Sequence, residues 1–346
     1  MKLALSIGYS GARMALPVAR VQRAEALGYH SVWTAEAYGS DALSPLAYLA
    51  AVTQRIKLGA GIIQLAARTP ANAAMTAATI DAMSGGDRML LGIGVSGPQI
   101  VEGGYGQPWG IPYHRLKDYV AIIRKIWARE APVTHAGSEI SLPYTGPGAA
   151  GLAQPLKSIL HMNPNIPIYL GTGTEATVRL TGEIADGWLP LGFVPGSLPE
   201  YLPWLEQGFA RAGGGKSLRE LEIMANCHVC VDRDVSAALA ALKPETALYV
   251  GGMGARSKNF HKTLMTRRGF GAAAERVQEL YLAGRKTEAA AAVPDEWVDQ
   301  KSLVGPHARI LERFRAWADS GATMLGVRTQ QDEAVEVIAE AALKYA

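Results

Sequence analysis

The sequence predicts an α/β protein that folds as a (β/α)8 barrel, a TIM barrel with insertions. Short apolar segments alternate with segments of helical period along the whole chain, which is typical of parallel strands joined by helical crossovers. Helix-to-strand junctions repeat one pattern, seen in ALGYHSVW, IADGWLP and DSGATMLGV: a helix ends, a glycine follows and an apolar strand begins. Eight such strands indicate a closed barrel, and an open doubly wound sheet is the alternative.

Each element of the barrel is placed by its own local signal. Strands are expected where apolar runs are bounded by glycine or polar residues, and helices where apolar residues recur at helical spacing. Hydroxyl residues followed by proline mark two helix starts, at Ser44 and Thr69, because the hydroxyl caps the helix and proline suits its first position. The expected strands are Lys2–Ile7, Ser31–Glu36, Lys57–Ile63, Met89–Val95, Ile166–Leu170, Gly187–Leu191, Glu222–Val231 and Thr323–Val327. The expected helices are Pro17–Leu27, one from Ser44 onward, Thr69–Ser84, Tyr113–Ala128, Thr174–Ile184, Leu198–Ala212 and Glu333–Lys344.

Two insertions interrupt this regular order. Residues 129–165 are rich in glycine and proline and are expected to form a loop after the fourth helix. Residues 245–304 separate the seventh and eighth strands and are expected to be partly helical, as in GAAAERVQELYLAG. No linker or shift of composition divides the chain, so we expect one domain over residues 1–346.

Charge and composition argue against several classes of protein. The net charge of +3 is too small to indicate a nucleic-acid-binding protein. No apolar run reaches the roughly 18 residues that a membrane helix needs, and the N-terminal segment lacks the features of a signal peptide, so we expect a cytoplasmic protein. Cys227 and Cys230 lie three residues apart in an apolar segment and would point to opposite faces of a strand, so we expect no metal site.

A basic segment lies within the second insertion. Residues 247–274 contain no acidic residue, and the basic residues among them are Arg256, Lys258, Lys262, Arg267 and Arg268. This local excess favours an anionic ligand, although a solvated helix face explains it equally well. Aromatic residues do not alternate with these charges, so we do not expect nucleic acid as a partner.

The active site of a barrel lies at the carboxyl ends of its strands. Glu36 is the single residue that we assign to those ends and that is charged at pH 7, so it is the candidate catalytic residue. Backbone and small polar groups dominate elsewhere, which suits a large organic cofactor that carries the chemistry itself. The turn at residues 171–174 precedes a helix and could cradle a phosphate through its backbone N–H groups. Tyr9 and Tyr38 also lie at strand ends and could line a substrate pocket.

Two long segments resemble the F420-dependent branch of the bacterial-luciferase-like oxidoreductases. They are LGAGIIQLAARTPANAAMTAATIDAMSGGDRMLLGIGVSGPQIVEGGYG and IPIYLGTGTEATVRLTGEIADGWLP, and LYVGGMGARSKNFH resembles a mycobacterial-type subgroup. The resemblance implies that the deazaflavin coenzyme F420 exchanges a hydride with a small organic substrate. It also implies a homodimer paired through the helices in ALSPLAYLAAV and NAAMTAATIDAM. The alternative within the same superfamily is an FMN-dependent monooxygenase.

The resemblance also assigns roles to single residues. Glu36 stands where the family has an acidic residue near the ring, but Ala37 follows it where some relatives have a histidine proton donor, so the donor stays open. A non-prolyl cis peptide is implied between Gly61 and Ile62, in the bulge behind the ring. The cofactor-binding residues implied are Gly61, Ile62, Ile63 and Gln64 at the ring, Ser96, Gly97 and Gln99 in the loop facing it, and Gly171, Thr172, Gly173 and Thr174 at the phosphate. We expect Arg256 and Lys258 to bind the acidic tail of the cofactor or, alternatively, an anionic substrate.

Overall fold

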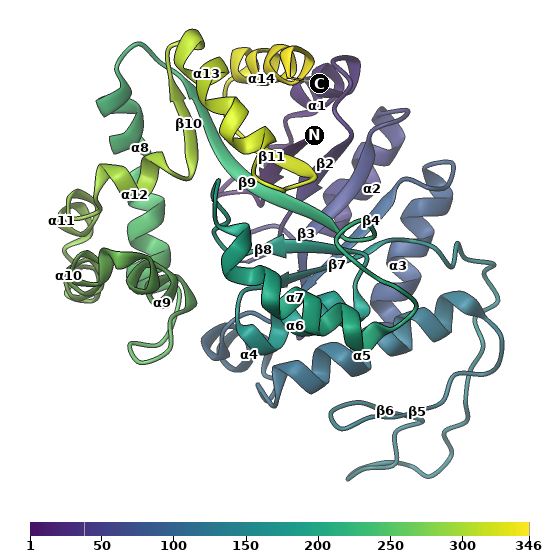
Figure 1. The fold of residues 1–346 in the computed structure, drawn as a ribbon. Coiled ribbons are helices and arrows are strands. Elements are labelled where there is room, and N and C mark those ends of the chain that lie inside the picture. Colours follow the sequence, from purple (N-terminus) through teal and green to yellow (C-terminus); the bar gives the residue numbers. More distant parts are fainter. Residues whose placement is uncertain (38, 346) are drawn as a thin grey trace.

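Eight parallel strands close a barrel in the computed structural model, which describes residues 1–37 and 39–345 (Figure 1). These strands are β1 (Lys2–Gly8), β2 (Ser31–Thr34), β3 (Lys57–Gln64), β4 (Met89–Gly94), β7 (Ile168–Thr172), β8 (Gly187–Pro190), β9 (Glu222–Val231) and β11 (Met324–Arg328). They follow this order around the barrel, and β11 closes the ring between β9 and β1, where Lys2 pairs with Met324. The predicted barrel is therefore confirmed, and the open sheet is not what forms.

Helices cover the outside of the barrel (Figure 1). They are α1 (Val18–Ala26), α2 (Leu43–Val52), α3 (Pro70–Met83), α5 (Pro112–Ala128), α6 (Glu175–Ile184), α7 (Leu198–Ala212), α13 (His307–Ala318) and α14 (Asp332–Lys344). Thr69 caps α3 as expected, since its hydroxyl accepts a hydrogen bond from the backbone N–H of Asn72. The cap expected from Ser44 comes from Asp41 instead, whose carboxylate accepts the N–H groups of Leu43 and Ser44. None of the described helices is long and apolar enough to cross a membrane.

Side chains of the barrel strands alternate between an inner and an outer packing layer. Inside the barrel, Trp33 and Tyr169 pack edge to face with 5.1 Å between ring centroids, and Met224 and Met324 lie in the same cluster. Trp33 is 1% exposed and is therefore part of the barrel core. Trp188 instead points into the outer layer, between the strands and the helices. The inner cluster fills the barrel, so a ligand can approach only at the carboxyl ends of the strands.

The first insertion contains one short hairpin. Within residues 129–165, β5 (His135–Ala136) and β6 (Ser141–Leu142) pair in antiparallel fashion, and Figure 1 shows them at the edge of the molecule. His135 Nε2 lies 3.0 Å from the carboxylate of Asp118, on α5. This contact ties the hairpin to the outside of the barrel.

The second insertion is helical and has an apolar core of its own. Its elements are α8 (Val235–Ala247), the π-helical turn η1 (Leu248–Gly252), α9 (Phe260–Met265), the kinked turn η2 (Thr266–Phe270), α10 (Gly271–Leu282), α11 (Lys286–Ala291), α12 (Asp295–Asp299) and the strand β10 (Ser302–Gly305). Val277, Leu280 and Trp297 are buried in its core, separate from the two barrel layers. Figure 1 shows these helices together on one side of the barrel.

The strand β10 is an element that the sequence did not predict. It pairs in parallel with the carboxyl half of β9, with Ser302 opposite His228 and Gly305 opposite Val231. Its four residues were too short a run to stand out from the helices around them. Cys227 faces the outer barrel layer while Cys230 packs on the insertion core, so the two thiols point to opposite faces as expected. β9 therefore belongs to the barrel at one end and to the insertion at the other.

Candidate cofactor and substrate site

One wall of the barrel mouth is made of glycines, and we call it the glycine wall: Gly61 on β3, Gly94 on β4 and Gly171 on β7. Gly94 and Gly171 point inward, since they follow Leu90 and Tyr169 of the inner cluster by an even number of residues. A Cβ atom on Gly94 or Gly171 would approach the Ile62 side chain to 2.8 or 2.9 Å. The missing side chains leave a flat surface topped by Ile62, on which a planar ring could rest.

The bulge in β3 has the form that the sequence predicts. The peptide bond between Gly61 and Ile62 is cis, and the pairing register with β4 shifts between Ala60 and Ile63. Ile62 packs against the inner cluster, at the mouth. Ile63 is fully buried in the outer layer, so its side chain does not present the apolar surface that we expected of it. A ring at this place would meet only the backbone of Ile63.

Glu36 is held by three groups of donors at the end of β2. Its carboxylate accepts hydrogen bonds from the backbone N–H groups of Ala42 (3.1 Å) and Gln64 (2.8 Å), and from the guanidinium of Arg68 (2.7 Å). The side chain is 4% exposed. These contacts fasten the segment after β2 to the end of β3. Arg68 was missed by sequence reasoning, although a lone arginine in the apolar run LAART is a visible signal.

Gln64 carries an acceptor without a partner. The residue is 1% exposed, and its Nε2 donates to the carbonyl oxygen of Glu36 at 3.1 Å. Among the described residues, no donor reaches its buried Oε1. A buried acceptor of this kind is rare in a folded protein unless a ligand or water completes it. Gln64 could therefore accept a hydrogen bond from an N–H group at the edge of a bound ring.

The loop after β4 forms the rim beside the glycine wall. Ser96 adopts a left-handed conformation with φ of 54°, and Gly97 precedes α4 (Pro98–Tyr105). The carbonyl oxygen of Ser96 accepts a hydrogen bond from Trp109 Nε1 at 3.4 Å. Gln99 is exposed on α4. This loop thus brings backbone groups, rather than fixed side chains, to the rim.

Only some groups of the turn at residues 171–174 are available to bind the predicted phosphate. Gly173 follows β7 on the inward side, and Thr174 caps α6 through a capping box with Thr177. The hydroxyl of Thr172 faces outward and lies 2.8 Å from that of Thr181 on α6, so it is already engaged. A phosphate at this turn would meet backbone N–H groups and the exposed Thr174, and not the Thr172 hydroxyl.

Arg256 and Lys258 lie exposed on the segment that leads into α9. Lys258 Nζ lies 3.8 Å from the centre of the Trp109 ring, a cation–π contact that joins the insertion to the loop after β4. The other basic residues of the segment pair with carboxylates: Lys262 with Glu275, and Arg267 and Arg268 with Glu200. Within the described ranges, neither Arg256 nor Lys258 has such a partner. They are the two cations of this segment that are free to meet an anion.

The opposite wall of the mouth carries the charges that sequence reasoning missed. We call it the charged wall; its members are His228 on β9, Arg328 on β11, Glu245 on α8 and Lys301 before β10. In the order around the barrel, β9 lies opposite β3 and β11 opposite β4. His228 and Arg328 each follow an inward methionine by four residues, so both face the mouth. Arg328 donates to Glu245 at 2.8 Å, and His228 Nε2 lies 3.2 Å from Arg328 and 3.4 Å from Glu245.

Burial sets the protonation of the charged wall. Desolvation, followed by the charge of Arg328, lowers the pKa of His228 to about 4. Burial alone would raise the pKa of Glu245, but Arg328 and His228 outweigh it and lower that pKa. His261 on α9 packs on Tyr249 with 4.7 Å between ring centroids, and burial lowers its pKa to about 4 as well. Both histidines are therefore neutral at pH 7.

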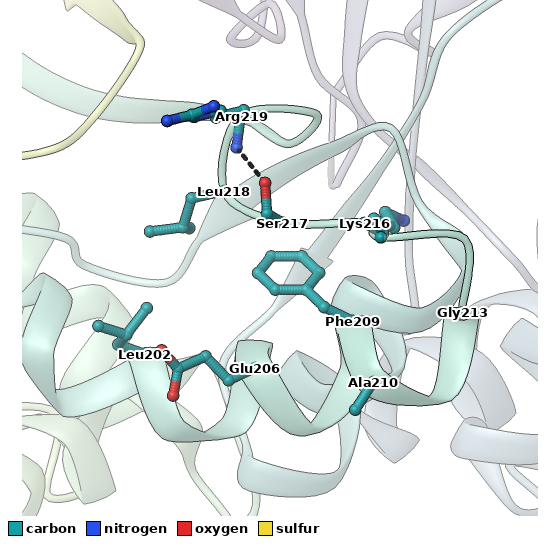
Figure 2. Close-up of a pocket in the computed structure, with 10 residues that line it drawn as sticks. Leu202, Glu206, Phe209, Ala210, Gly213, Lys216, Ser217, Leu218 and Arg219 are labelled. Carbon is teal, nitrogen blue, oxygen red and sulfur yellow. Dashed lines mark hydrogen bonds between the residues drawn. The ribbon is translucent and has the colours of Figure 1, made fainter.

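A hollow of about 560 Å3 lies elsewhere on the molecule (Figure 2). It is bounded by α7, with Phe209 on its wall, and by the segment Gly213–Arg219, which leads into β9. A segment that enters a strand lies at the amino end of the barrel. This hollow is consequently at the opposite end from the mouth and is not part of the candidate site.

A barrel with a flat wall for a ring, an unpaired acceptor at its edge and a charged wall across from it is a cofactor-dependent enzyme of the TIM-barrel class. The luciferase-like monooxygenase family matches residues 5–324, and the chain belongs to this family. It is 46% identical to "Putative coenzyme F420-dependent oxidoreductase Rv3520c" of Mycobacterium tuberculosis over 341 residues, 98% of each chain.

Solved structures share the fold over nearly the full length. The coenzyme F420-dependent tetrahydromethanopterin reductase of Methanopyrus kandleri superposes with a TM-score of 0.79 at 22% identity, over 99% of each chain. An F420-dependent secondary alcohol dehydrogenase, solved with an F420–acetone adduct, superposes with a TM-score of 0.75 at 16% identity, over 98% of this chain and 97% of that one. The likeness extends through both insertions, because almost no part of the chain is left uncovered.

Proposed function

We propose that the chain is an F420-dependent oxidoreductase that transfers a hydride between the deazaflavin and a small organic substrate. One observation carries the proposal: the glycine wall, with Ile62 on its surface and the unpaired Gln64 Oε1 at its edge, fits one face and one edge of a planar heterocycle. The mycobacterial relative, 46% identical over nearly the whole chain, supports F420 as that heterocycle. The FMN-dependent monooxygenase is the second candidate.

Different residues of the mouth would bind different parts of the cofactor. Ile62 and the glycines behind it would support the ring, and Gln64 would hold its edge. The turn at residues 171–174 would bind the phosphate through backbone N–H groups. Arg256 and Lys258, which have no partner carboxylate in the described ranges, would meet the acidic tail at the rim. Ser96, Gly97 and Gln99 would close the rim from the side of α4.

The bound deazaflavin supplies a ring carbon that donates or accepts the hydride. The protein contributes position and exclusion of water. Glu36 acts as a positioning residue, because each of its two carboxylate oxygens already accepts one hydrogen bond from a backbone N–H and one from Arg68. The contact of Lys258 with Trp109 holds the insertion against the rim and shields the mouth. Ala37 offers no proton, and Glu36 is engaged by its donors, so the proton would come from a group of the substrate, from the charged wall or from solvent.

The test is a titration of the protein with F420 and with FMN, followed by the fluorescence of each ring. We expect F420 to bind and FMN to bind much more weakly. Tighter binding of FMN would contradict the proposal and favour the monooxygenase. Oxygen consumption with each reduced cofactor gives a second readout, because a reduced flavin reacts readily with oxygen and a reduced deazaflavin does not.

We also propose a homodimer that pairs through α2 and α3. These helices carry large apolar side chains that are exposed: Tyr48 is 57% exposed, Met75 55% and Met83 61%. Neighbouring exposed apolar side chains are typical of an interface. Sedimentation should give the mass of two chains, and Met75→Glu should shift the equilibrium toward the monomer. A monomeric wild-type protein would contradict this proposal.

A further inference from the structure

Lys301 stands on the charged wall and has no counter-ion in the part of the chain that the structure describes. Its carbonyl oxygen accepts the N–H of His228 at 3.4 Å, which places it level with the carboxyl end of β9. Its Nζ lies 4.4 Å from the centre of the Trp297 ring. Among the described residues, no acceptor is within hydrogen-bond distance of Nζ and no carboxylate is within 4 Å, although Nζ is not sealed from solvent. The ammonium group of Lys301 could therefore bind a ligand.

The other groups of the charged wall already satisfy one another. Glu245 receives a hydrogen bond from Arg328 at 2.8 Å and lies 3.4 Å from His228 Nε2. These three side chains join the insertion to β9 and β11, so they account for the attachment of the insertion without Lys301. A lysine with a purely structural role at such depth would be paired, because an unpaired buried ammonium is costly.

The balance of charge points to an anion. Desolvation lowers the pKa of Lys301 to about 8, Glu245 opposes that shift, and Arg268 and Arg328 add to it. His228 and His261 are neutral at pH 7. The wall therefore carries the charges of Arg328 and Lys301 against the single carboxylate of Glu245. An anionic ligand beside Lys301 would remove this excess of positive charge.

We propose that Lys301 forms an anion subsite for the substrate, which binds an anionic oxygen group, either a carboxylate or a phosphate. This inference rests on the proposed function and deepens it, since the subsite belongs to the wall that faces the ring. His261 lies close enough for the charge of Lys301 to help lower its pKa, and its neutral ring could donate a second hydrogen bond to the anion. Arg328, although it is hydrogen-bonded to Glu245, adds a positive electrostatic potential at the place of the anion.

Benzoate and phenyl phosphate are the probes, because they share a ring and differ in the anion. Calorimetry on the protein without cofactor should show binding of at least one of them at pH 7. The probe that binds more tightly identifies the preferred anion, carboxylate or phosphate. Benzyl alcohol, which has no charge, should not bind. Affinity should fall as pH rises through about 8, because Lys301 loses its proton there, while Glu245 stays ionised and His228 and His261 stay neutral. The other charged groups that act on Lys301 are Arg268 and Arg328.

Three variants isolate the lysine. Lys301→Met should weaken the bound probe about tenfold or more, as the loss of a charged hydrogen bond predicts, and should remove the pH dependence near 8. Lys301→Arg should restore binding without titrating in this range. Lys286→Met removes an exposed lysine of the same insertion and is the matched control, with unchanged affinity. Thermal unfolding of each variant establishes that it is folded.

Equal probe affinity in wild type and Lys301→Met, or no binding of either probe by the wild type, would overturn the subsite. Titration with F420 separates this failure from failure of the proposed function. A Lys301→Met protein that keeps its F420 affinity but loses the probe supports the subsite. A wild-type protein that binds a probe but no F420 contradicts the proposed function and leaves the anion subsite in place.

Discussion

The two walls of the mouth are built by different means. The glycine wall consists of barrel backbone from which side chains are missing, and the ion pair behind it, Glu36 with Arg68, is 4% and 16% exposed. The charged wall consists of side chains, half of them supplied by the insertion, and its pair of Glu245 with Arg328 is 33% and 36% exposed. The barrel itself thus shapes the place for the ring, whereas the place for the substrate depends on the insertion. Changes on the two walls should therefore affect the two ligands separately.

The largest difference should appear in stability. Arg68→Met leaves the buried carboxylate of Glu36 without its cation, so the free energy of unfolding should fall by about 3–5 kcal/mol. Glu245→Gln breaks the matching pair on the charged wall, where solvent screens the remaining charge, so the loss should be about 1 kcal/mol. Urea denaturation measures both. Equal losses would show that the two pairs are equivalent and would break the comparison.

The next effect concerns the ring itself. Gly171→Val places a branched side chain where a Cβ atom alone would come within 2.9 Å of Ile62, so the flat surface is lost. F420 affinity should fall about 100-fold, while binding of benzoate or phenyl phosphate at the charged wall should persist. Gly104→Ala on α4, where a Cβ atom meets nothing within 4 Å, is the control. Loss of both ligands together would argue against separate walls.

A smaller effect is expected at the rim. Reversing both charges, with Arg256→Glu and Lys258→Glu, should weaken F420 about tenfold at low ionic strength, and the difference should shrink in high salt because these residues are exposed. Fluorescence titration at two salt concentrations measures it. Unchanged affinity at low salt would reject the tail contact. The alternative is that these residues bind an anionic substrate, and weaker binding of phenyl phosphate in the same variant would then favour it.

The smallest effect is one of pH. Burial lowers the pKa of His261 from its ordinary value of 6.5 to about 4. Between these values the unfolded chain takes up a proton that the folded chain does not, so stability falls as pH drops through this window and is unaffected above it. His261→Gln should avoid about 1 kcal/mol of that loss in denaturation curves at pH 7 and 4.5. His307→Gln, on a side chain 48% exposed, should behave like the wild type.

Local signals allowed much of the barrel and of the glycine wall to be predicted. The strand order, the cap at Thr69, the cis bond at Gly61–Ile62 and the turn before α6 each follow from a few neighbouring residues or from a resemblance carried by continuous segments. The glycine wall is accessible to such reasoning because glycines within apolar runs are visible in the sequence. Tyr38, expected at the pocket, lies outside the described residues.

The charged wall could not be found in this way, because its members meet only when the barrel closes. The expected seventh strand ended at Val231, beyond His228, and the expected eighth ended at Val327, one residue before Arg328. Counting inward positions from Met224 and Met324 would have placed both side chains at the mouth. Glu245 and Lys301 come from the two ends of the insertion, 56 residues apart, and no local pattern joins them.

The double membership of β9 has a consequence for how the mouth opens. The first half of β9 pairs with β8 and β11, and its second half pairs with β10 of the second insertion. Because the second insertion is joined to the barrel by this hydrogen-bonded pairing of β9 with β10, it cannot move away from the mouth as a unit without breaking those hydrogen bonds. We therefore expect ligands to enter where the insertion meets the loop after β4, beside the contact between Lys258 and Trp109. Amide hydrogens of the β9–β10 ladder should exchange slowly with solvent, and those of the segment that carries Lys258 should exchange quickly. The mobile part of the mouth is then this loop, while the rest of the second insertion stays fixed to the barrel.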